Sequence, residues 1–141
     1  MSLSIAPMPV VVDASVAVDL AIGERVETPA AVRAWITEGR LLLAPAAAWT
    51  EIGHAILRRL DGDAIRATRR LEQVEATGLE TADRGPAGVR SAMILAERHR
   101  LSVYDASYLW LAIDVDGELA THDRDLARAA LAEGVALALD T

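Results

Sequence analysis

The stretch Val10-Val11-Val12-Asp13-Ala14-Ser15 is the part of the sequence that decides the fold. Three consecutive β-branched apolar residues are typical of a short strand buried on both faces, as the strands of parallel sheets are. An acidic residue follows at once, and residues 14–22 then have the composition of a helix. The stretch therefore predicts a strand that runs directly into a helix, with an acidic side chain at the carboxyl end of the strand.

The remainder of the chain alternates short apolar runs with helical segments. Further strands are expected at residues 41–43, 79–81, 118–121 and 135–139, and further helices at residues 29–39, 45–60, 63–77, 86–99, 104–114 and 123–133. Thr28 is the expected N-cap of the second helix, and Pro45 is expected to open the third. Strands that alternate with helices predict an α/β fold with a parallel sheet covered on both sides.

A length of 141 residues and an apolar content of 52% fit a single domain with a sizeable core. We expect that domain to span residues 10–141, after an N-terminal extension at residues 1–9. The chain has no cysteine, so a disulfide and a thiolate metal site are excluded. The first basic residue is Arg25 and no apolar run approaches about 18 residues, which predicts a cytoplasmic protein without a membrane span.

Four acidic residues lie beside or within apolar segments, where a carboxylate is costly unless something pairs with it: Asp13, Glu51, Asp105 and Asp123. The chain contains no lysine, and no arginine is adjacent in sequence to the first three of these acids. Two carboxylates about 5 Å apart repel by roughly 3 kcal/mol at an effective dielectric constant of about 20. Mg²⁺ or Mn²⁺ would remove this repulsion, since both ions take oxygen ligands. We therefore expect a metal-dependent enzyme, and hydrolysis of a phosphodiester bond suits such a site best.

Each acid alone also suits a purely structural role. Asp13 and Asp123 each stand where an expected helix needs an N-cap, and Asp105 would complete a capping box with Ser102. Glu51 would suit a solvated helix face. These readings stay open for the single residues, and the metal interpretation depends on the four acids occurring together near the carboxyl ends of strands.

The ordered set of motifs resembles the PIN domain, and specifically the VapC-type toxins of bacterial toxin-antitoxin pairs. The motifs are Val11-Val12-Asp13-Ala14-Ser15, Glu51 in a helix opened by proline, Leu101-Ser102-Val103-Tyr104-Asp105-Ala106, and Leu119-Ala120-Thr121-His122-Asp123. The resemblance spans residues 10–139, nearly the whole chain. It implies a three-layer α/β/α fold with a central, mainly parallel sheet, and a Mg²⁺- or Mn²⁺-dependent endoribonuclease that leaves a 5′-phosphate.

The resemblance also implies roles for individual residues, and partners. The family's acidic positions, which are catalytic metal ligands, correspond to Asp13, Glu51, Asp105 and Asp123. Ser15 and Thr121 match hydroxyl positions that hold a ligand or a water molecule, and Asp125 would be a substitute or auxiliary ligand. The expected partners are an RNA substrate, a small antitoxin that wraps the toxin with its C-terminal segment, and a second copy of the chain in a homodimer.

The net charge of −7 argues at first sight against a nucleic-acid partner, because phosphate binding needs a basic surface. Bound metal would, however, neutralise four of the 21 acids, and residues 58–70 carry five arginines: Arg58, Arg59, Arg66, Arg69 and Arg70. This segment is the candidate RNA-binding face, although a solvated helix surface is equally compatible with it. His122, between Thr121 and Asp123, is a second candidate for contact with RNA.

Other families with acidic pockets fit less well. A phosphoacceptor receiver domain resembles this chain in its acidic pocket but uses a lysine, and this chain has none. A haloacid dehalogenase-like phosphatase would need an aspartate where this chain has Ser15. The remaining alternative to an enzyme is a non-catalytic PIN-like module that binds RNA or protein.

Overall fold

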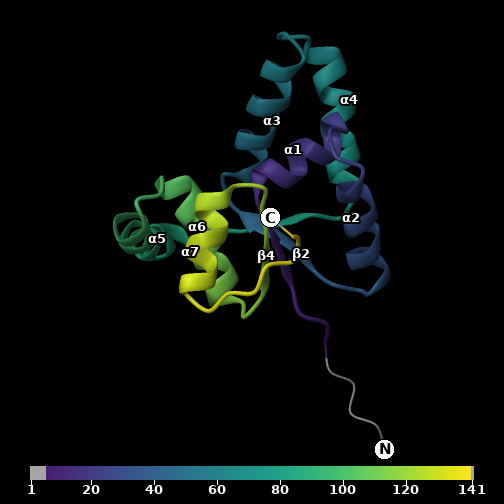
Figure 1. The fold of residues 1–141 in the computed structure, drawn as a ribbon. Helices are drawn as coiled ribbons and strands as arrows, with labels where there is room; N and C mark the ends of the chain where they lie inside the picture. The colour runs from purple at the N-terminus through teal and green to yellow at the C-terminus, as the bar shows by residue number, and fades with distance from the viewer. Residues whose placement is uncertain (1–5, 141) are drawn as a thin grey trace, which may run out of the picture.

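Four short strands form one sheet in the order β3-β2-β1-β4, and every neighbouring pair is parallel (Figure 1). The strands are β1 (Val10–Val12), β2 (Leu42–Pro45), β3 (Glu80–Ala82) and β4 (Glu118–Ala120). The computed structural model describes residues 6–140. Residues 1–5 of the expected extension and Thr141 at the end of the expected domain lie outside the described residues. The prediction of an α/β fold with a parallel sheet is confirmed.

Seven helices connect and flank the strands within residues 6–140. They are α1 (Ala14–Ile22), α2 (Glu27–Thr37), α3 (Ala48–Arg59), α4 (Ala64–Glu75), α5 (Gly85–His99), α6 (Val103–Asp114) and α7 (Arg124–Ala132). Helix α1 packs against α2, α3 and α4, whereas α6 packs against α5, α7 and three of the strands. The sheet lies between these two groups of helices (Figure 1), so the helices cover both of its faces.

The centre of the sheet is apolar because β1 and its neighbours have no polar face. Val10 and Val11 are fully buried, and Leu119 of β4 and Leu109 of α6 are equally inaccessible. Parallel strands covered on both sides are expected to show such continuous apolar runs. This packing fixes the position of β1, and with it the position of the acidic residue that follows.

Two expected helix starts are wrong. Helix α2 begins at Glu27 and its N-cap is Val26, so Thr28 does not cap it; the Thr28 hydroxyl instead donates to Asp19 Oδ2 of α1 at 2.5 Å. Pro45 ends β2, and α3 begins three residues later. Proline has no backbone N–H to give to a sheet, and the last residue of a strand tolerates that loss.

The expected last strand at residues 135–139 is reduced to one parallel bridge between Leu119 and Leu137. Two backbone hydrogen bonds support the bridge, from Leu119 N–H to Ala136 O at 3.0 Å and from Ala138 N–H to Leu119 O at 2.9 Å. The apolar residues are therefore where the sequence suggested, but too few backbone pairs form to make a strand.

Helices α3 and α4 project away from the sheet as a hairpin, at the top of Figure 1. The turn between them places Asp61 and Gly62 at positive φ, 56° and 79°, and Asp63 then caps α4 through its side chain. The five arginines at residues 58–70 lie on this hairpin.

Among residues 6–140, none of the helices combines the length and the apolar composition that a bilayer span requires.

Candidate metal centre

The acidic residues gather where the connections of the sheet change direction. From β1 the chain moves to β2 and β3 on one side, and it then returns to β4 on the other side of β1. Asp13 directly follows β1, and Asp123 lies three residues after the end of β4. The Asp13 N–H donates to Ala120 O at 2.9 Å, which ties the two strand ends together. Ligands of open α/β sheets bind at such a switch point.

Asp13 is the most deeply buried acid of the site, with an exposed fraction of 4%. Its Oδ2 accepts hydrogen bonds from the Ser15 hydroxyl at 2.6 Å and from the Thr121 hydroxyl at 2.8 Å. Although it occupies the N-cap position of α1, its side chain makes no capping bond. Burial raises the pKa of Asp13, and the nearby Asp123 carboxylate raises it further. The structure thus joins Ser15 and Thr121 to one oxygen of Asp13, and helix capping does not explain this residue.

Glu51 lies in the first turn of α3 and is partly buried. The hydroxyl of Tyr108, a residue of α6 with no exposed surface, donates to Glu51 Oε1 at 3.3 Å. Burial raises the pKa of Glu51, and the carboxylates of Asp13 and Asp105 add to the rise. Glu51 therefore faces the other acids and does not lie on a solvated face.

Asp105 lies in the first turn of α6, partly buried. Ser102 caps that helix by accepting from the Asp105 backbone N–H at 3.0 Å, so the serine half of the expected capping box is present. The pKa of Asp105 is raised by burial first and then by the charges of Asp13 and Asp123. Its carboxylate thus belongs to the acidic group while its backbone takes part in the cap.

Asp123 combines the two roles that the sequence left open. Its Oδ1 accepts the N–H groups of Asp125 at 2.8 Å and Leu126 at 3.2 Å, and so caps α7. Its own N–H donates to the Thr121 hydroxyl at 3.0 Å. The cap fixes the carboxylate at the same end of the sheet as Asp13, whose pKa it raises.

The four carboxylates are electrostatically coupled but do not form a closed cage. Among residues 6–140, no three His, Asp or Glu side chains lie close enough together to enclose a metal ion. The donor set still suits a hard divalent cation, because it consists of carboxylate oxygens whose mutual repulsion a bound cation would relieve. The carboxylates would have to close around the ion as it binds.

Asp125 is separate from this group. Its side chain is exposed on α7 and pairs with Arg128 one turn further along the helix.

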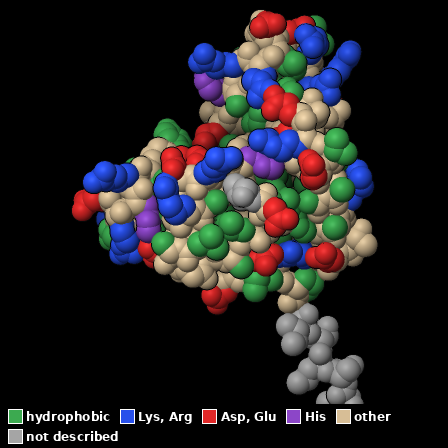
Figure 2. Space-filling view, in the orientation of Figure 1, with side chains coloured by type: hydrophobic (Ala, Val, Ile, Leu, Met, Phe, Trp, Pro, Cys, Tyr) green, Lys and Arg blue, Asp and Glu red, His purple; other side chains and the backbone are tan. Residues whose placement is uncertain are grey.

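Two of the five arginines of the α3–α4 hairpin make contacts with other parts of the chain, Arg59 with Glu24 and Arg70 with the carbonyl oxygen of Ala21 at 3.3 Å. Figure 2 shows basic and acidic side chains interspersed over this face of the molecule, including the projecting hairpin.

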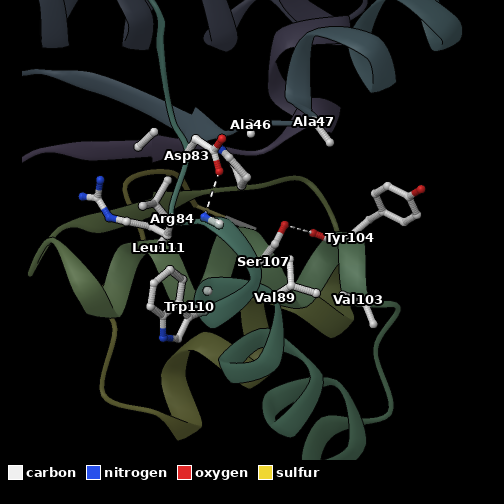
Figure 3. A pocket seen from close by; sticks show the side chains of 14 residues that line it. Ala46, Ala47, Asp83, Arg84, Val89, Val103, Tyr104, Ser107, Trp110 and Leu111 are labelled. Atoms are coloured by element: carbon white, nitrogen blue, oxygen red, sulfur yellow. Dashed lines mark hydrogen bonds between the residues drawn. The ribbon is translucent and has the colours of Figure 1, made fainter.

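A pocket of about 400 Å³ lies at the carboxyl ends of β2 and β3, next to the beginning of α6 (Figure 3). Its lining is mostly apolar, and it includes Trp110 of α6 and Val89 of α5. Tyr104 and Ser107, which lie on either side of Asp105 in the sequence, also line it, and the Ser107 hydroxyl donates to Tyr104 O at 2.5 Å. The pocket therefore lies beside the first turn of α6, which carries Asp105.

Reasoning from the sequence missed Tyr108 and Asp19. Tyr108 is the polar residue within the buried face of α6, and a buried tyrosine hydroxyl needs a hydrogen-bond partner, which was an available signal. Asp19 is 2% exposed within α1 and contacts Thr28 and His122. Its partners lie outside α1, and no local pattern of the sequence indicated them.

Comparison with known proteins places this geometry in context. The chain matches the family model of the PIN domain over residues 10–131. No curated protein sequence matches the chain. The structure is similar to that of PAE2754 from Pyrobaculum aerophilum, with a TM-score of 0.70 and 24% sequence identity over 93% of this chain and 84% of that chain.

Two further solved structures show the same fold. VapC20 from Mycobacterium tuberculosis, described as a sarcin-ricin loop cleaving toxin, has a TM-score of 0.68 and 17% identity, over 85% of this chain and 94% of that chain. A toxin-antitoxin complex from Klebsiella pneumoniae has a TM-score of 0.66 and 19% identity, over 94% of this chain and 99% of that chain. At these identities the similarity establishes the fold alone.

Proposed function

This chain belongs to the PIN domain family, and on that premise we propose that it is a Mg²⁺- or Mn²⁺-dependent endoribonuclease that acts as the toxin of a bacterial toxin-antitoxin system. Asp13, Glu51, Asp105 and Asp123 would hold the metal. The reaction is hydrolysis of an RNA phosphodiester bond.

The observation that carries the proposal is the coupling of carboxylates from four separate elements. Burial and neighbouring carboxylates raise the pKa values of Asp13, Glu51 and Asp105. A fold does not gain stability from collecting like charges in a partly buried position, so the arrangement is best explained by a bound cation.

The protein holds part of this donor set in place before any ligand binds. Ser15 and Thr121 fix Oδ2 of Asp13, and Tyr108 holds Oε1 of Glu51. The backbone of α7 holds Oδ1 of Asp123. When bound, a divalent cation supplies polarisation of a phosphoryl oxygen and neutralises charge that develops during hydrolysis. Hydrogen bonds that orient ligands in this way commonly tune metal affinity.

The proposed partners are RNA, a cognate antitoxin protein and a second copy of the chain. One of the similar structures, the toxin-antitoxin complex from Klebsiella pneumoniae, supports the antitoxin. Helix α5 exposes Val89, Met93 and Ile94 close to the pocket, which supports a protein interface on that side. Light scattering of the isolated protein would test the homodimer.

The absence of a closed metal cage among residues 6–140 favours one other function, a non-catalytic PIN-like module that binds RNA or protein. The two functions differ in what they require of the carboxylates. A nuclease must bind Mg²⁺ or Mn²⁺ with them, whereas a binding module needs no metal.

The deciding experiment is calorimetric titration of Mn²⁺ into metal-free protein, with wild type compared with Asp13→Asn and Asp125→Asn. We expect binding by wild type, loss of binding in Asp13→Asn, and wild-type binding in Asp125→Asn, whose carboxylate pairs with Arg128. Cleavage of RNA in the presence of Mn²⁺, abolished by the same Asp13 substitution, completes the test. No binding by wild type at millimolar Mn²⁺ would favour the non-catalytic module.

A further inference from the structure

A second buried polar cluster lies next to the acidic site and has no part in the function proposed above. Asp19 of α1 and Thr28 of α2 have exposed fractions of 2% and 1%, and the His122 side chain, from the turn between β4 and α7, is 13% exposed. Asp19 and Thr28 are nine positions apart in the sequence, and His122 lies 94 positions beyond Thr28. Burying a carboxylate is costly, so the cluster needs an explanation.

The hydrogen bonds of this cluster assign the proton on His122. Thr28 gives its single hydroxyl proton to Asp19 Oδ2 at 2.5 Å. His122 Nε2 lies 3.2 Å from the Thr28 hydroxyl oxygen and 3.3 Å from Asp19 Oδ2, and both of these atoms can only accept. Nε2 therefore carries the proton and donates to them. The imidazole is held in one orientation by two acceptors.

His122 links this cluster to the acidic site through its backbone. The His122 N–H donates to Ser15 Oγ at 3.0 Å, and the Ser15 hydroxyl donates to Asp13 Oδ2. The two residues on either side of His122 are Thr121, which bonds the same Asp13 oxygen, and Asp123. The turn that carries two residues of the acidic site is thus anchored on one side by Asp13 and on the other by α1 and α2.

We infer that Asp19 and Thr28 are positioning residues: by holding the His122 ring, they fix the turn of residues 121–123 and so place Asp123 opposite Asp13. The inference rests on the proposed function in so far as the placement serves metal binding. It assigns a role to the His122 side chain that differs from the expected contact with RNA.

Asp19 has two distinct oxygens, and this provides a control. Oδ1 accepts the Arg25 backbone N–H at 3.1 Å and lies 3.7 Å from the Arg25 guanidinium, whereas Oδ2 serves Thr28 and His122. A substitution of the Arg25 side chain removes the guanidinium near Oδ1 and leaves in place the backbone N–H bond to Oδ1 and the bonds made by Oδ2. A substitution of Thr28 disturbs Oδ2, which is the oxygen that faces the turn.

The test compares Thr28→Val, which keeps the shape and removes the hydroxyl, with Thr28→Ser, which restores it. His122→Phe serves as a second way to break the link. Arg25→Gln controls for the other oxygen of Asp19, and Val74→Ala, at a buried position of α4, controls for a general loss of stability. Two readouts are used: Mn²⁺ affinity by calorimetry, and exchange of the Asp123 amide proton in metal-free protein by NMR.

We expect Thr28→Val and His122→Phe to weaken Mn²⁺ binding about tenfold, as the loss of a residue that orients a metal ligand commonly does. Both should speed exchange of the Asp123 amide, which is hydrogen-bonded to Thr121. Thr28→Ser should return both quantities to wild-type values. Neither Arg25→Gln nor Val74→Ala should weaken Mn²⁺ binding.

Unchanged exchange of the Asp123 amide in both Thr28→Val and His122→Phe would overturn the inference, whatever the metal affinity. Wild-type Mn²⁺ affinity in both variants would also overturn it, because the cluster would then be only structural. If wild type binds no Mn²⁺ while Thr28→Val still speeds the exchange, the positioning of the turn is upheld and the proposed metal site fails. The two failures are therefore distinguishable.

Discussion

The Tyr108 hydroxyl donates a hydrogen bond to Glu51 Oε1 at 3.3 Å and thereby joins the buried face of α6 to the first turn of α3. The bond matters for the charge on Glu51. Burial raises the pKa of Glu51, whereas the hydrogen bond from Tyr108 lowers it. Tyr108 therefore helps to keep a crowded carboxylate ionised and available to a cation.

Tyr108→Phe is predicted to leave the fold intact, to cost roughly 1 kcal/mol of stability, and to weaken Mn²⁺ binding. Without the hydroxyl, the pKa of Glu51 should rise further, so the loss of affinity should be larger at pH 6 than at pH 8. Calorimetric titration of Mn²⁺ into wild type and Tyr108→Phe at about these two pH values measures the difference in affinity. Tyr104→Phe is the matched control, because Tyr104 is 60% exposed. Wild-type affinity of Tyr108→Phe at both pH values would contradict the assigned role.

Asp105→Asn is predicted to abolish RNA cleavage while the protein stays folded. The substitution removes one of the coupled charges with little change in volume, and it leaves the backbone N–H that Ser102 accepts. Cleavage of a labelled RNA and circular dichroism of the same sample give the two readouts. Full activity in a folded Asp105→Asn protein would remove Asp105 from the catalytic set.

The parts of the fold that could be predicted are those fixed by hydrophobic pattern. The run Val10-Val11-Val12 specified β1, and the acids that follow β1 and precede α7 were expected at the edge where the structure has them. The errors occurred where a residue suits two local roles. Thr28 has the preference of a helix cap and Pro45 that of a first helical residue. In the structure, the Thr28 hydroxyl instead donates to Asp19, and Pro45 is the last residue of β2.

The finer geometry of the site depends on contacts between residues distant in sequence, which no local pattern contains. Glu51 and Tyr108 are separated by 57 positions, and Thr121 and Asp13 by 108. The sequence left Asp125 open as a substitute or auxiliary ligand beside Asp123. Only the structure shows that Asp125 points to Arg128 while Asp123 faces the other acids.

Asp13 is predicted to make the stability of the metal-free protein depend on pH. Its pKa is raised above 3.8 in the folded state, mainly by burial, so the folded protein binds this proton more tightly than the unfolded chain does. The free energy of unfolding should therefore fall as the pH rises from about 3.8 through the raised pKa, and level off above it.

Urea unfolding of metal-free wild type and of Asp13→Asn, from about pH 4 to about pH 8, measures this effect. The decline should be shallower in Asp13→Asn, which has no proton to lose at this position. Added Mn²⁺ should reverse the trend for wild type, because a cation binds the ionised carboxylates and stabilises the folded state. Parallel curves for the two metal-free proteins would contradict the raised pKa of Asp13 in the folded state.

Replacing Arg66, Arg69 and Arg70 together by glutamine is predicted to flatten the salt dependence of RNA binding. These side chains, with Gln73, line a shallow hollow on α4. Each lost phosphate contact with single-stranded RNA should reduce the slope of log affinity against log salt by about 0.7. Arg33→Gln on α2 is the control. An unchanged slope in the triple variant would show that these arginines do not contact RNA and only form a solvated helix face.

Two glycines in helices give opposite predictions for the same substitution. A Cβ at Gly88 of α5 would lie 2.7 Å from Arg84 Cβ and 3.0 Å from Cζ3 of Trp110, a residue that lines the pocket. A Cβ at Gly53 of α3 would have nothing within 4 Å. Gly88→Ala should therefore destabilise the protein by about 1 to 3 kcal/mol through overpacking. Gly53→Ala should stabilise it by up to about 1 kcal/mol, because alanine favours a helix.

Denaturant unfolding of both variants decides whether Gly88 is required by its close approach to Arg84 and Trp110. If both substitutions stabilise the protein, Arg84 and Trp110 can shift away from the added Cβ without cost, and this side of the pocket is deformable. If Gly88→Ala alone destabilises the protein, Arg84 and the Trp110 ring cannot both shift away from the α5 backbone without cost. The side of the pocket formed by Arg84 and Trp110 is then rigid, whereas Tyr104, Val89 and Val103, which are exposed, line other parts of it.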